Sequence, residues 1–353
     1  MQPRKRMLYN LAGFILMSAS YFSPALALSA QPPGPVPVIF DTDIGSDVDD
    51  ALALGVLHAL QSRDRCRILA VTCTKDLPLS GPFIDLVNTF YGRGDIPVGV
   101  VRNGKKAKDS RYLAACVTAR DDGRLRYPRT LQSGDDAPEA VGLLRRVLAD
   151  QPDGSVVFVV VGFSTNIARL LDTPPDAHSE LAGRQLVERK CRLLSIMAGM
   201  FSDEGRHEEH NVVMDLEAAR KVFADWPTPI VASGFEIGQA IRFPAVSIRR
   251  DFNYVRHHPL REAYENYLPM PYDRPTWDLT SVLYAVQPDR GYFGLSEPGT
   301  IHIDADRITR FTPNPAGRHR YLTVTDEQIV RVREALVQLA SQPPATRTAS
   351  DSK

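Results

Sequence analysis

The sequence predicts an α/β protein built on an open, mostly parallel sheet with helices on both faces. Apolar runs rich in valine and isoleucine, the kind that buried parallel strands need, alternate along the chain with stretches of helical periodicity. Several of these runs end abruptly in polar residues, as strands do where a ligand meets the carboxyl edge of such a sheet. No repeat and no linker-like segment interrupts residues 31–341, which we expect to form a single domain.

The elements of the first half follow from these patterns in order. Apolar runs predict strands at 38–40, 67–72, 96–101 and 155–161. Apolar residues at helical spacing predict helices at 51–60, 83–91 and 140–148. The last of the strands is the richest in β-branched residues and should lie near the centre of the sheet. Periodicity fails between 102 and 137, where charge dominates and we expect a long loop.

The second half continues the alternation of strands and helices. Further strands are expected at 193–197, 229–233, 300–304 and 320–324. Helices are expected to begin after Ser164 or Thr165, to begin at Asp215 as a cap, and to span 276–286 and 326–339. Residues 251–275 form a Tyr- and Pro-rich connection suited to close over a pocket, and 342–353 is expected to be a disordered tail. Trp226 is expected to serve packing.

The chain begins with the pattern of a secretory signal peptide at residues 1–27. Three basic residues, 4–6, precede an apolar run and the small-residue motif Ala25-Leu26-Ala27. We therefore expect a secreted or periplasmic protein, with an uncleaved anchor as the weaker alternative. The 42 basic and 42 acidic residues form no basic stripe for nucleic acid, and no later apolar run is long enough to span a membrane. Four scattered cysteines are too few for a disulfide scaffold.

The most informative stretch is an acidic one between the first strand and the first helix. Five carboxylates fall within ten positions, at Asp41, Asp43, Asp47, Asp49 and Asp50. Helix capping accounts for about two of them, because a helix N-terminus favours negative charge. Several carboxylates that converge on one point require a hard cation with oxygen ligands, either Ca²⁺ or Mg²⁺. The residues themselves thus predict a metal site at the sheet edge.

The segment Asp41-Thr-Asp43-Ile44-Gly-Ser-Asp47-Val-Asp49-Asp50-Ala resembles the N-terminal signature of the calcium-dependent nucleoside hydrolases. That family usually reads Asp-x-Asp-Pro-Gly-x-Asp-Asp-Ala. Here Ile44 replaces the proline, and two extra residues precede the paired aspartates. The resemblance implies an open, Rossmann-like sheet, and it leaves Asp47 and Asp49 as alternatives for a ribose contact.

Three later segments extend the resemblance over roughly residues 36 to 290. Residues 162–168 are similar to the family's Gly-Gly-x-Thr-Asn-Ile-Ala, and Glu209-His-Asn211 is similar to its Glu-Phe-Asn. Asp203 stands where the family commonly has a sugar-binding Asn. Trp277-Asp278 stands where many members read His-Asp-Pro and purine-preferring members read Trp-Asp.

The resemblance implies a role for each matching residue. Calcium would be held by Asp43, Asp50, Asp278 and the backbone carbonyl of Val161. Asp43 would also be the catalytic base that takes a proton from water. Substrate-binding candidates are Asp49, Asp76, Met197, Asp203, Glu209, Asn211 and Trp277.

The leading hypothesis is an exported N-glycosyl hydrolase that cleaves purine nucleosides to base and ribose, as in purine salvage. Because an indole cannot donate the proton, Trp277 would stack on the base while solvent or Asp76 protonates it, or Trp277 would simply anchor the core. One rival is a non-catalytic protein that binds calcium and ribose. Another is a hydrolase of the same fold that acts on a different ribosyl compound. The expected partner is a nucleoside, and a homo-oligomer is compatible with the sequence.

Overall fold

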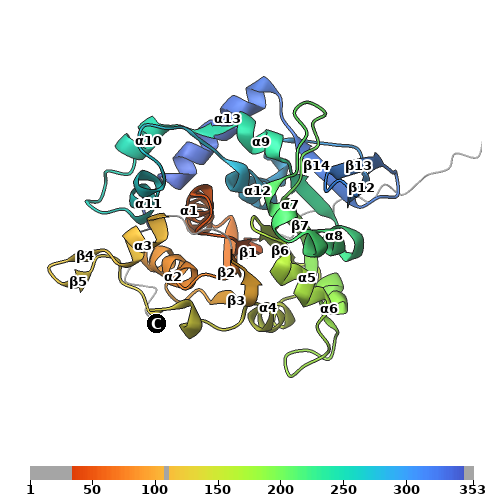
Figure 1. The fold of residues 1–353 in the computed structure, drawn as a ribbon, viewed down its shortest axis with the longest axis horizontal. Coiled ribbons are helices and arrows are strands. Elements are labelled where there is room, and N and C mark those ends of the chain that lie inside the picture. The colour runs from red at the N-terminus through yellow and green to blue at the C-terminus, as the bar shows by residue number, and fades with distance from the viewer. Residues whose placement is uncertain (1–33, 107–110, 346–353) are drawn as a thin grey trace, which may run out of the picture. The chain divides into compact units, whose positions relative to one another are not determined.

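The protein has a central ten-stranded sheet (Figure 1). The computed structural model describes residues 34–106 and 111–345. Nine strands follow one another across the sheet in the order β13 (Thr309–Pro313), β12 (Gly299–Ile303), β14 (His319–Thr323), β8 (Ile230–Ser233), β7 (Cys191–Met197), β6 (Val156–Val160), β1 (Val36–Thr42), β2 (Cys66–Lys75) and β3 (Val98–Lys105). The short strand β11 (Gly294–Leu295) pairs with β14 beside this path.

The strands from β14 to β3 run parallel, and those at the other end of the sheet are antiparallel. The chain starts at β1 in the middle, builds outward through β2 and β3, and then returns to β6 on the other side of β1. Asp41 of β1 lies opposite Val160 of β6 and Thr72 of β2. The gap between the carboxyl ends of β1 and β6 is therefore the point where strand order reverses, and open α/β sheets bind ligands at that point.

Helices cover both faces of the sheet, so the predicted α/β fold is confirmed (Figure 1). One face carries α1 (Asp49–Ser62), α2 (Ser80–Phe90), α3 (Arg111–Val117), α11 (Pro259–Tyr267), α12 (Trp277–Val286) and α13 (Asp326–Ala340). The other carries α4 (Ala140–Ala149), α5 (Thr165–Leu171), α6 (Gly183–Lys190) and α8 (Leu216–Asp225). Shorter elements are α7 (His210–Met214), α9 (Phe235–Ala240), α10 (Ala245–Arg250), β4 (Arg120–Asp121), β5 (Arg124–Leu125), β9 (Arg242–Phe243), β10 (Arg274–Pro275), and the 3₁₀ turns Gly134–Asp136 and Pro288–Arg290.

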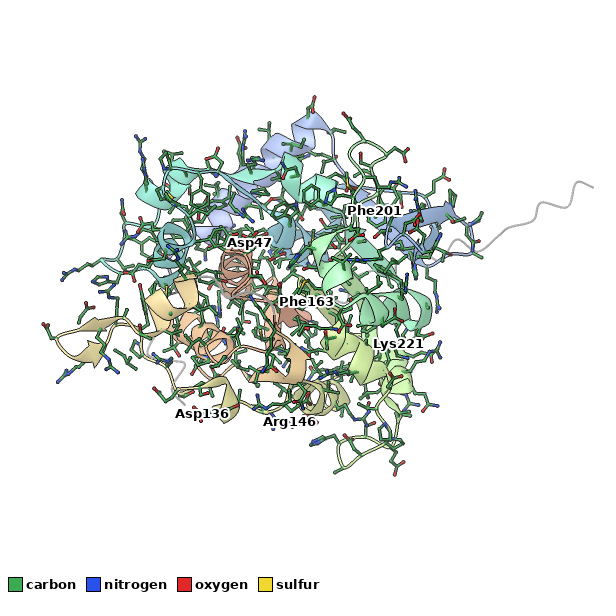
Figure 2. The ribbon with its side chains drawn as sticks, viewed as in Figure 1. Asp47, Asp136, Arg146, Phe163, Phe201 and Lys221 are labelled. Carbon is green, nitrogen blue, oxygen red and sulfur yellow. The ribbon has the colours of Figure 1, made fainter. Side chains whose placement is uncertain are left out.

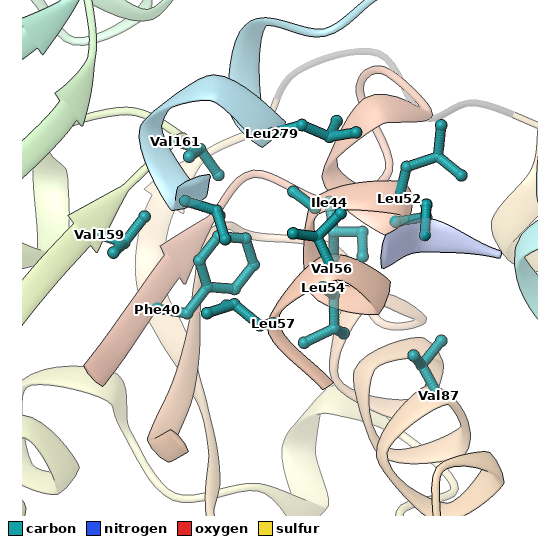
Figure 3. Packing of buried hydrophobic residues seen from close by; sticks show 14 of the residues in the cluster. Phe40, Ile44, Leu52, Leu54, Val56, Leu57, Val87, Val159, Val161 and Leu279 are labelled. Atoms are coloured by element: carbon teal, nitrogen blue, oxygen red, sulfur yellow. The ribbon is translucent and has the colours of Figure 1, made fainter. Parts of the chain in front are cut away.

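Alternation along the central strands supplies a hydrophobic cluster to each face. Phe40 of β1 and Val159 of β6 pack with Leu57 of α1 in the first cluster (Figure 3). Their neighbours Ile39 and Phe158 point to the second cluster. Burial on both faces explains why β1 and β6 are continuous apolar runs, and it fixes β1 rigidly at the centre.

The expected packing role of Trp226 is confirmed, because its side chain is buried in the second cluster and its indole N–H donates to Thr228 Oγ1 at 2.8 Å. Asp215 stands at the N-terminus of α8, as expected, but its carboxylate makes no capping bond. It accepts from Thr165 Oγ1 at 2.6 Å and pairs with Lys105 instead.

Two regions expected to lack regular structure contain helices. Residues 102–137 hold α3 and the β4–β5 hairpin, and residues 251–275 hold α11. Both helices bury their apolar faces in the first cluster, where Leu113 and Leu260 are fully buried. Tertiary packing thus stabilises helices too short for their periodicity to be read from sequence. Strand β13 was also missed.

The expected signal peptide lies outside the described residues, as does most of the expected tail. Gln342, at the start of that tail, accepts a hydrogen bond from Arg63 Nε at 2.6 Å. Within the described ranges, no helix has the length and apolar character needed to cross a membrane. All four cysteines are buried there and unpaired.

Candidate active site

The acidic loop that follows β1 is held by hydrogen bonds from three other elements. Asp41 accepts from Thr72 Oγ1 at 2.5 Å and from Asn166 Nδ2 at 2.8 Å, which ties β1 to β2 and α5. Gly45 has a φ of +103°, and a Cβ there would lie 2.5 Å from a Leu113 methyl carbon. Only glycine fits this turn, because it adopts positive φ freely and brings no side chain.

Two buried side chains fix the same turn from outside. The ammonium group of Lys75 donates to Gly45 O at 2.8 Å. The hydroxyl of Tyr112 accepts from Gly45 N at 2.6 Å and donates to Asp47 O at 2.8 Å. The carboxylates beyond the turn therefore have fixed positions at the start of α1.

A cavity of about 760 Å³ opens at the carboxyl ends of β1 and β6. It is lined by Asp43, Ser46, Asp47, Asp49, Asp50, Arg111, Val161, Met197, Glu209, His210, Asn211, Phe235, Tyr267, Leu268, Pro269, Arg274, Trp277 and Asp278. Asp47 lies beside α1, and Phe163 lies near the end of β6 (Figure 2). The cavity thus brings together acids that are far apart in the sequence, as the resemblance implied.

Three carboxylates form a tight buried cluster on the cavity floor. Oxygen atoms of Asp49, Asp50 and Asp278 lie within 4.8 Å of one another. The backbone N–H of Asp278 also donates to Asp49 Oδ2 at 3.2 Å, which joins the start of α12 to the start of α1. The cluster contains two of the expected metal ligands, and Asp49, expected to contact ribose, is its third member.

Burial and mutual repulsion disfavour negative charge in this cluster. Burial raises the pKa of Asp49, Asp50 and Asp278 well above the usual carboxyl value, and the neighbouring carboxylates raise it further. A buried divalent cation would remove this cost, because it replaces repulsion with attraction. The donor set therefore fits a hard cation with oxygen ligands.

Asp43 faces the same cavity from the end of β1. Its side chain is buried, and its Oδ2 atom has no hydrogen-bond partner among the described residues. Burial raises its pKa, while the Ser46 hydroxyl, His210 and Lys75 oppose that effect. Asp43 is the strongest charged neighbour of Asp50, although its carboxylate does not belong to the group of three. An orphaned carboxylate oxygen beside the cluster is suited to accept a proton from a bound water.

Glu209 and Asn211 also line the cavity. Glu209 caps α7, accepting from Asn211 N at 2.9 Å, Gly199 N at 3.0 Å and Val212 N at 3.2 Å. Burial raises its pKa to about 7. The side-chain amide of Asn211 donates to the carbonyls of Val161 at 2.7 Å and Met197 at 3.2 Å. Both polar side chains are thus rigidly held at the ends of β6 and β7.

A wall of the cavity, which we define as Phe235, Tyr267, Arg274 and Trp277, combines three aromatic rings with one guanidinium group. The indole N–H of Trp277 donates to Phe235 O at 2.9 Å, and the two rings lie 5.2 Å apart. The guanidinium of Arg274 lies 5.1 Å from the ring centroids of both Tyr267 and Trp277 and pairs with Asp47. Burial lowers the pKa of Arg274 to about 10, so it remains charged at neutral pH.

Two predicted substrate-binding residues lie outside the cavity lining. Asp76 turns toward β3, where it accepts from Gly104 N at 3.3 Å. The side chain of Asp203 is 98% exposed and pairs with Arg206. We therefore leave both out of the proposed contacts, since neither carboxylate faces the space where a ligand would bind.

The sequence interpretation overlooked Arg111, Arg274 and Phe235. Phe235 follows β8 directly, so its place at the carboxyl edge of a strand was a usable signal. Arg274 carried no such signal, because it lies in a connection whose path is set by tertiary packing.

An open α/β sheet with a buried carboxylate cluster at its switch point defines a class of small-molecule-binding proteins with a cation site. Residues 38–309 match the family described as inosine-uridine preferring nucleoside hydrolase, so the chain belongs to that family.

Curated relatives are the pyrimidine-specific ribonucleoside hydrolases RihA. The protein of Citrobacter koseri is 29% identical over 225 residues, which cover 61% of this chain and 65% of the relative. That of Shewanella woodyi is 33% identical over 208 residues, which cover 57% and 60%. The chain thus matches less than two thirds of the length of these relatives.

Solved structures agree on the fold. A purine-preferring ribonucleoside hydrolase from Gardnerella vaginalis has a TM-score of 0.65 at 17% identity, covering 86% of this chain and 98% of that one. The plant nucleoside hydrolase PpNRh1 has a TM-score of 0.63 at 19% identity, covering 88% and 100%.

Proposed function

We propose that this protein hydrolyses the N-glycosidic bond of ribonucleosides to give a free base and ribose. The observation that carries the proposal is that Asp43, the carboxylate cluster and the Glu209–Asn211 pair line one cavity. A general base, a cation site and fixed polar groups for sugar hydroxyls are what this reaction requires. Family membership supports the same chemistry.

The cation in the proposal is Ca²⁺. Asp43, Asp50, Asp278 and the carbonyl of Val161 would hold it, and Asp49, the third member of the carboxylate cluster, lies beside them. Ca²⁺ accepts six to eight oxygen ligands in flexible geometry, which suits a set of carboxylates and a carbonyl. When bound, the cation supplies positive charge that lowers the pKa of a water and offsets the buried carboxylates.

The residues of this chain would then act in sequence. Asp43 takes a proton from a water molecule while the oxygen of that water attacks the anomeric carbon. Positive charge has developed on this carbon in an oxocarbenium-like transition state. Asp49 is favoured over Asp47 as the ribose contact, since Asp47 is already paired with Arg274. Glu209 and Asn211 hold further hydroxyls, and their fixed positions reduce the entropy lost on binding.

Base preference is the finer part of the proposal. The half-buried indole of Trp277, backed by Phe235, offers a surface on which a purine stacks. We therefore propose purine nucleosides as the preferred substrates. A pyrimidine preference is the second candidate, because the curated relatives carry that description in their names.

Base release from inosine, guanosine, uridine and cytidine, with Ca²⁺ and with a chelator, tests the proposal. We expect turnover that the chelator abolishes and that the variant Asp43→Ala loses. Tight ribose binding without turnover of any substrate would overturn the proposal in favour of a non-catalytic binding protein. Release of base only from another ribosyl compound would support a hydrolase of different specificity.

Export is also part of the proposal, on the strength of the basic, apolar and Ala-Leu-Ala pattern at residues 1–27. N-terminal sequencing of the protein recovered from a periplasmic fraction tests it. A chain that starts at Leu28 is expected, and a chain retained in the cell with its first residues intact would contradict it.

A further inference from the structure

The proposed reaction requires a group that stabilises the departing base, and neither Trp277 nor Asp76 can serve as that group. The N–H of Trp277 already donates to Phe235 O, and an indole is too weak an acid to give up a proton. Asp76 lies outside the cavity lining. Electron density that accumulates on the base must therefore be stabilised by another group in the wall.

Arg274 is positioned by three partners at the cavity. Its guanidinium lies 5.1 Å from the ring centroids of Tyr267 and Trp277, and one of its terminal nitrogens pairs with Asp47. Its backbone is paired with β9 at Phe243, which fixes where the side chain starts. Contacts on the ring faces and at one edge together restrict the guanidinium to one orientation.

The guanidinium of Arg274 has N–H donors that its pairing with Asp47 does not use. An arginine carries five N–H donors in a planar fork, and Asp47 uses one terminal nitrogen. The Nε atom is buried and has no hydrogen-bond partner in the described part of the chain. An unsatisfied buried donor next to a ligand cavity is costly unless a ligand satisfies it.

We propose that Arg274 is the residue that stabilises the leaving base, by donating hydrogen bonds to a ring nitrogen or exocyclic oxygen of that base. The inference rests on the proposed function and assigns one step of it to a residue. Tyr267 and Trp277 position the guanidinium, and Asp47 orients it.

The electron count of the step is simple. The bond between the anomeric carbon and the base nitrogen breaks, and its electron pair goes to the base. The water oxygen bonds to the anomeric carbon, and the water proton goes to Asp43. The base, held by the Arg274 N–H groups, then takes a proton from solvent. Asp43 releases its own proton to solvent, so the net change is nucleoside and water to base and ribose. Arg274 stays protonated throughout, as a charge-assisted donor.

Other nitrogen donors in the cavity are less suited to this role. The amide of Asn211 is already committed to the carbonyls of Val161 and Met197. His210 is exposed and acts on the charge of Asp43, at the end where water is activated. Arg111 is exposed and has no aromatic partner in the described residues, so its fork is not held in one orientation.

A comparison of good and poor leaving groups tests the inference. The variant Arg274→Gln is assayed on inosine and uridine, whose bases leave with difficulty, and on p-nitrophenyl riboside, whose nitrophenolate leaves without help. Removal of a donor to a developing negative charge costs about 10² to 10³ in kcat. We expect that loss on the nucleosides and a change below about threefold on p-nitrophenyl riboside.

Three further measurements serve as controls for this comparison. Arg333, an exposed arginine of α13, provides the matched control. The variant Arg333→Gln should cleave the nucleosides and p-nitrophenyl riboside at the wild-type rates. Circular dichroism and a thermal melt show that Arg274→Gln is folded. Added guanidinium ion should partly restore nucleoside cleavage by Arg274→Gly, because it can occupy the slot between the two rings.

The outcomes separate the inference from the proposed function. Equal losses on all substrates would overturn the inference and give Arg274 a purely structural role. A nucleoside-specific loss in His210→Asn, with Arg274→Gln unaffected, would overturn it in favour of His210. Failure of the wild-type protein to cleave any of the substrates would instead overturn the proposed function.

Discussion

The cavity has two sides that differ in burial and in origin. The carboxylate cluster and Asp43 are at most 5% exposed and come from the ends of β1, α1 and α12, which pack at the centre of the fold. Tyr267, Arg274 and Trp277 are half-buried and lie in or next to the connection from α11 to α12. The first side is thus part of the rigid framework, and the second is attached to it.

We infer that the two sides serve different parts of the proposed reaction. A carboxylate in the framework keeps its position when a loop changes, which suits the chemistry common to all substrates. A wall built on a connection tolerates replacement, which suits the selection of a leaving group. Variants of the cluster should therefore affect every substrate alike, and variants of the wall should distinguish between substrates.

The largest effect is expected from Asp43→Asn. The amide keeps the size of the side chain but cannot accept a proton, so kcat should fall by about 10² to 10⁴ on purine and pyrimidine nucleosides alike. Steady-state rates of base release measure it. Asp122→Asn, in the exposed turn of the β4–β5 hairpin, is the control. A loss of kcat confined to purine or to pyrimidine nucleosides would contradict a role for Asp43 in the chemistry common to all substrates.

Calcium should stabilise the protein through the carboxylate side of the cavity and not through the wall. Ligand at 100 times its Kd adds about 2.7 kcal/mol to the free energy of unfolding. For a domain of this size that is a rise in Tm of about 4 °C over the chelated protein. Differential scanning calorimetry should show the rise in wild type and in Trp277→Phe, and its loss in Asp50→Asn. A full rise in Asp50→Asn would place the cation elsewhere.

The metal-free protein should lose stability as pH rises from about 5 to 7. Burial raises the pKa of Glu209 to about 7, so the folded state keeps a proton that the unfolded state has already released. Each such group lowers the free energy of unfolding by up to about 1.4 kcal/mol per pH unit in this window. Urea midpoints measured in chelator at pH 5, 6 and 7 should show the slope.

Glu209→Gln provides the control for that slope. The substitution removes the titrating group, so the decline with pH should become shallower. Asp41, whose pKa burial also raises to about 7, keeps part of the slope in this variant. A stability that rises with pH in wild type would show that Glu209 is ionised throughout.

The carboxylate side of the cavity could be predicted from the sequence better than the wall could. The acids of the first loop follow one apolar run within ten positions, and parallel strands align their carboxyl ends, so their convergence could be expected. Glu209, Asn211 and Asp278 were placed only through the resemblance, because no local pattern shows which distant loops meet.

The failures have a common physical cause. Asp76 follows a strand, as Asp43 does, but sequence position does not show which way a side chain turns. Asp203 lies in the loop between β7 and α7, where its side chain is exposed to solvent and pairs with Arg206. Arg274, Tyr112 and Lys75 matter through contacts with residues far along the chain, and such contacts leave no periodicity to read.

The smallest and most selective effect is expected from Trp277→Phe. The new ring still packs on Phe235, but the hydrogen bond to Phe235 O is lost, at a cost of about 1 kcal/mol in stability. With less surface for a base to stack on, KM for inosine should rise several-fold, while kcat on p-nitrophenyl riboside stays within about twofold. Trp226→Phe, in the core, should instead lower Tm without altering KM. Equal KM values for wild type and Trp277→Phe would show that the indole anchors the wall and does not touch the base.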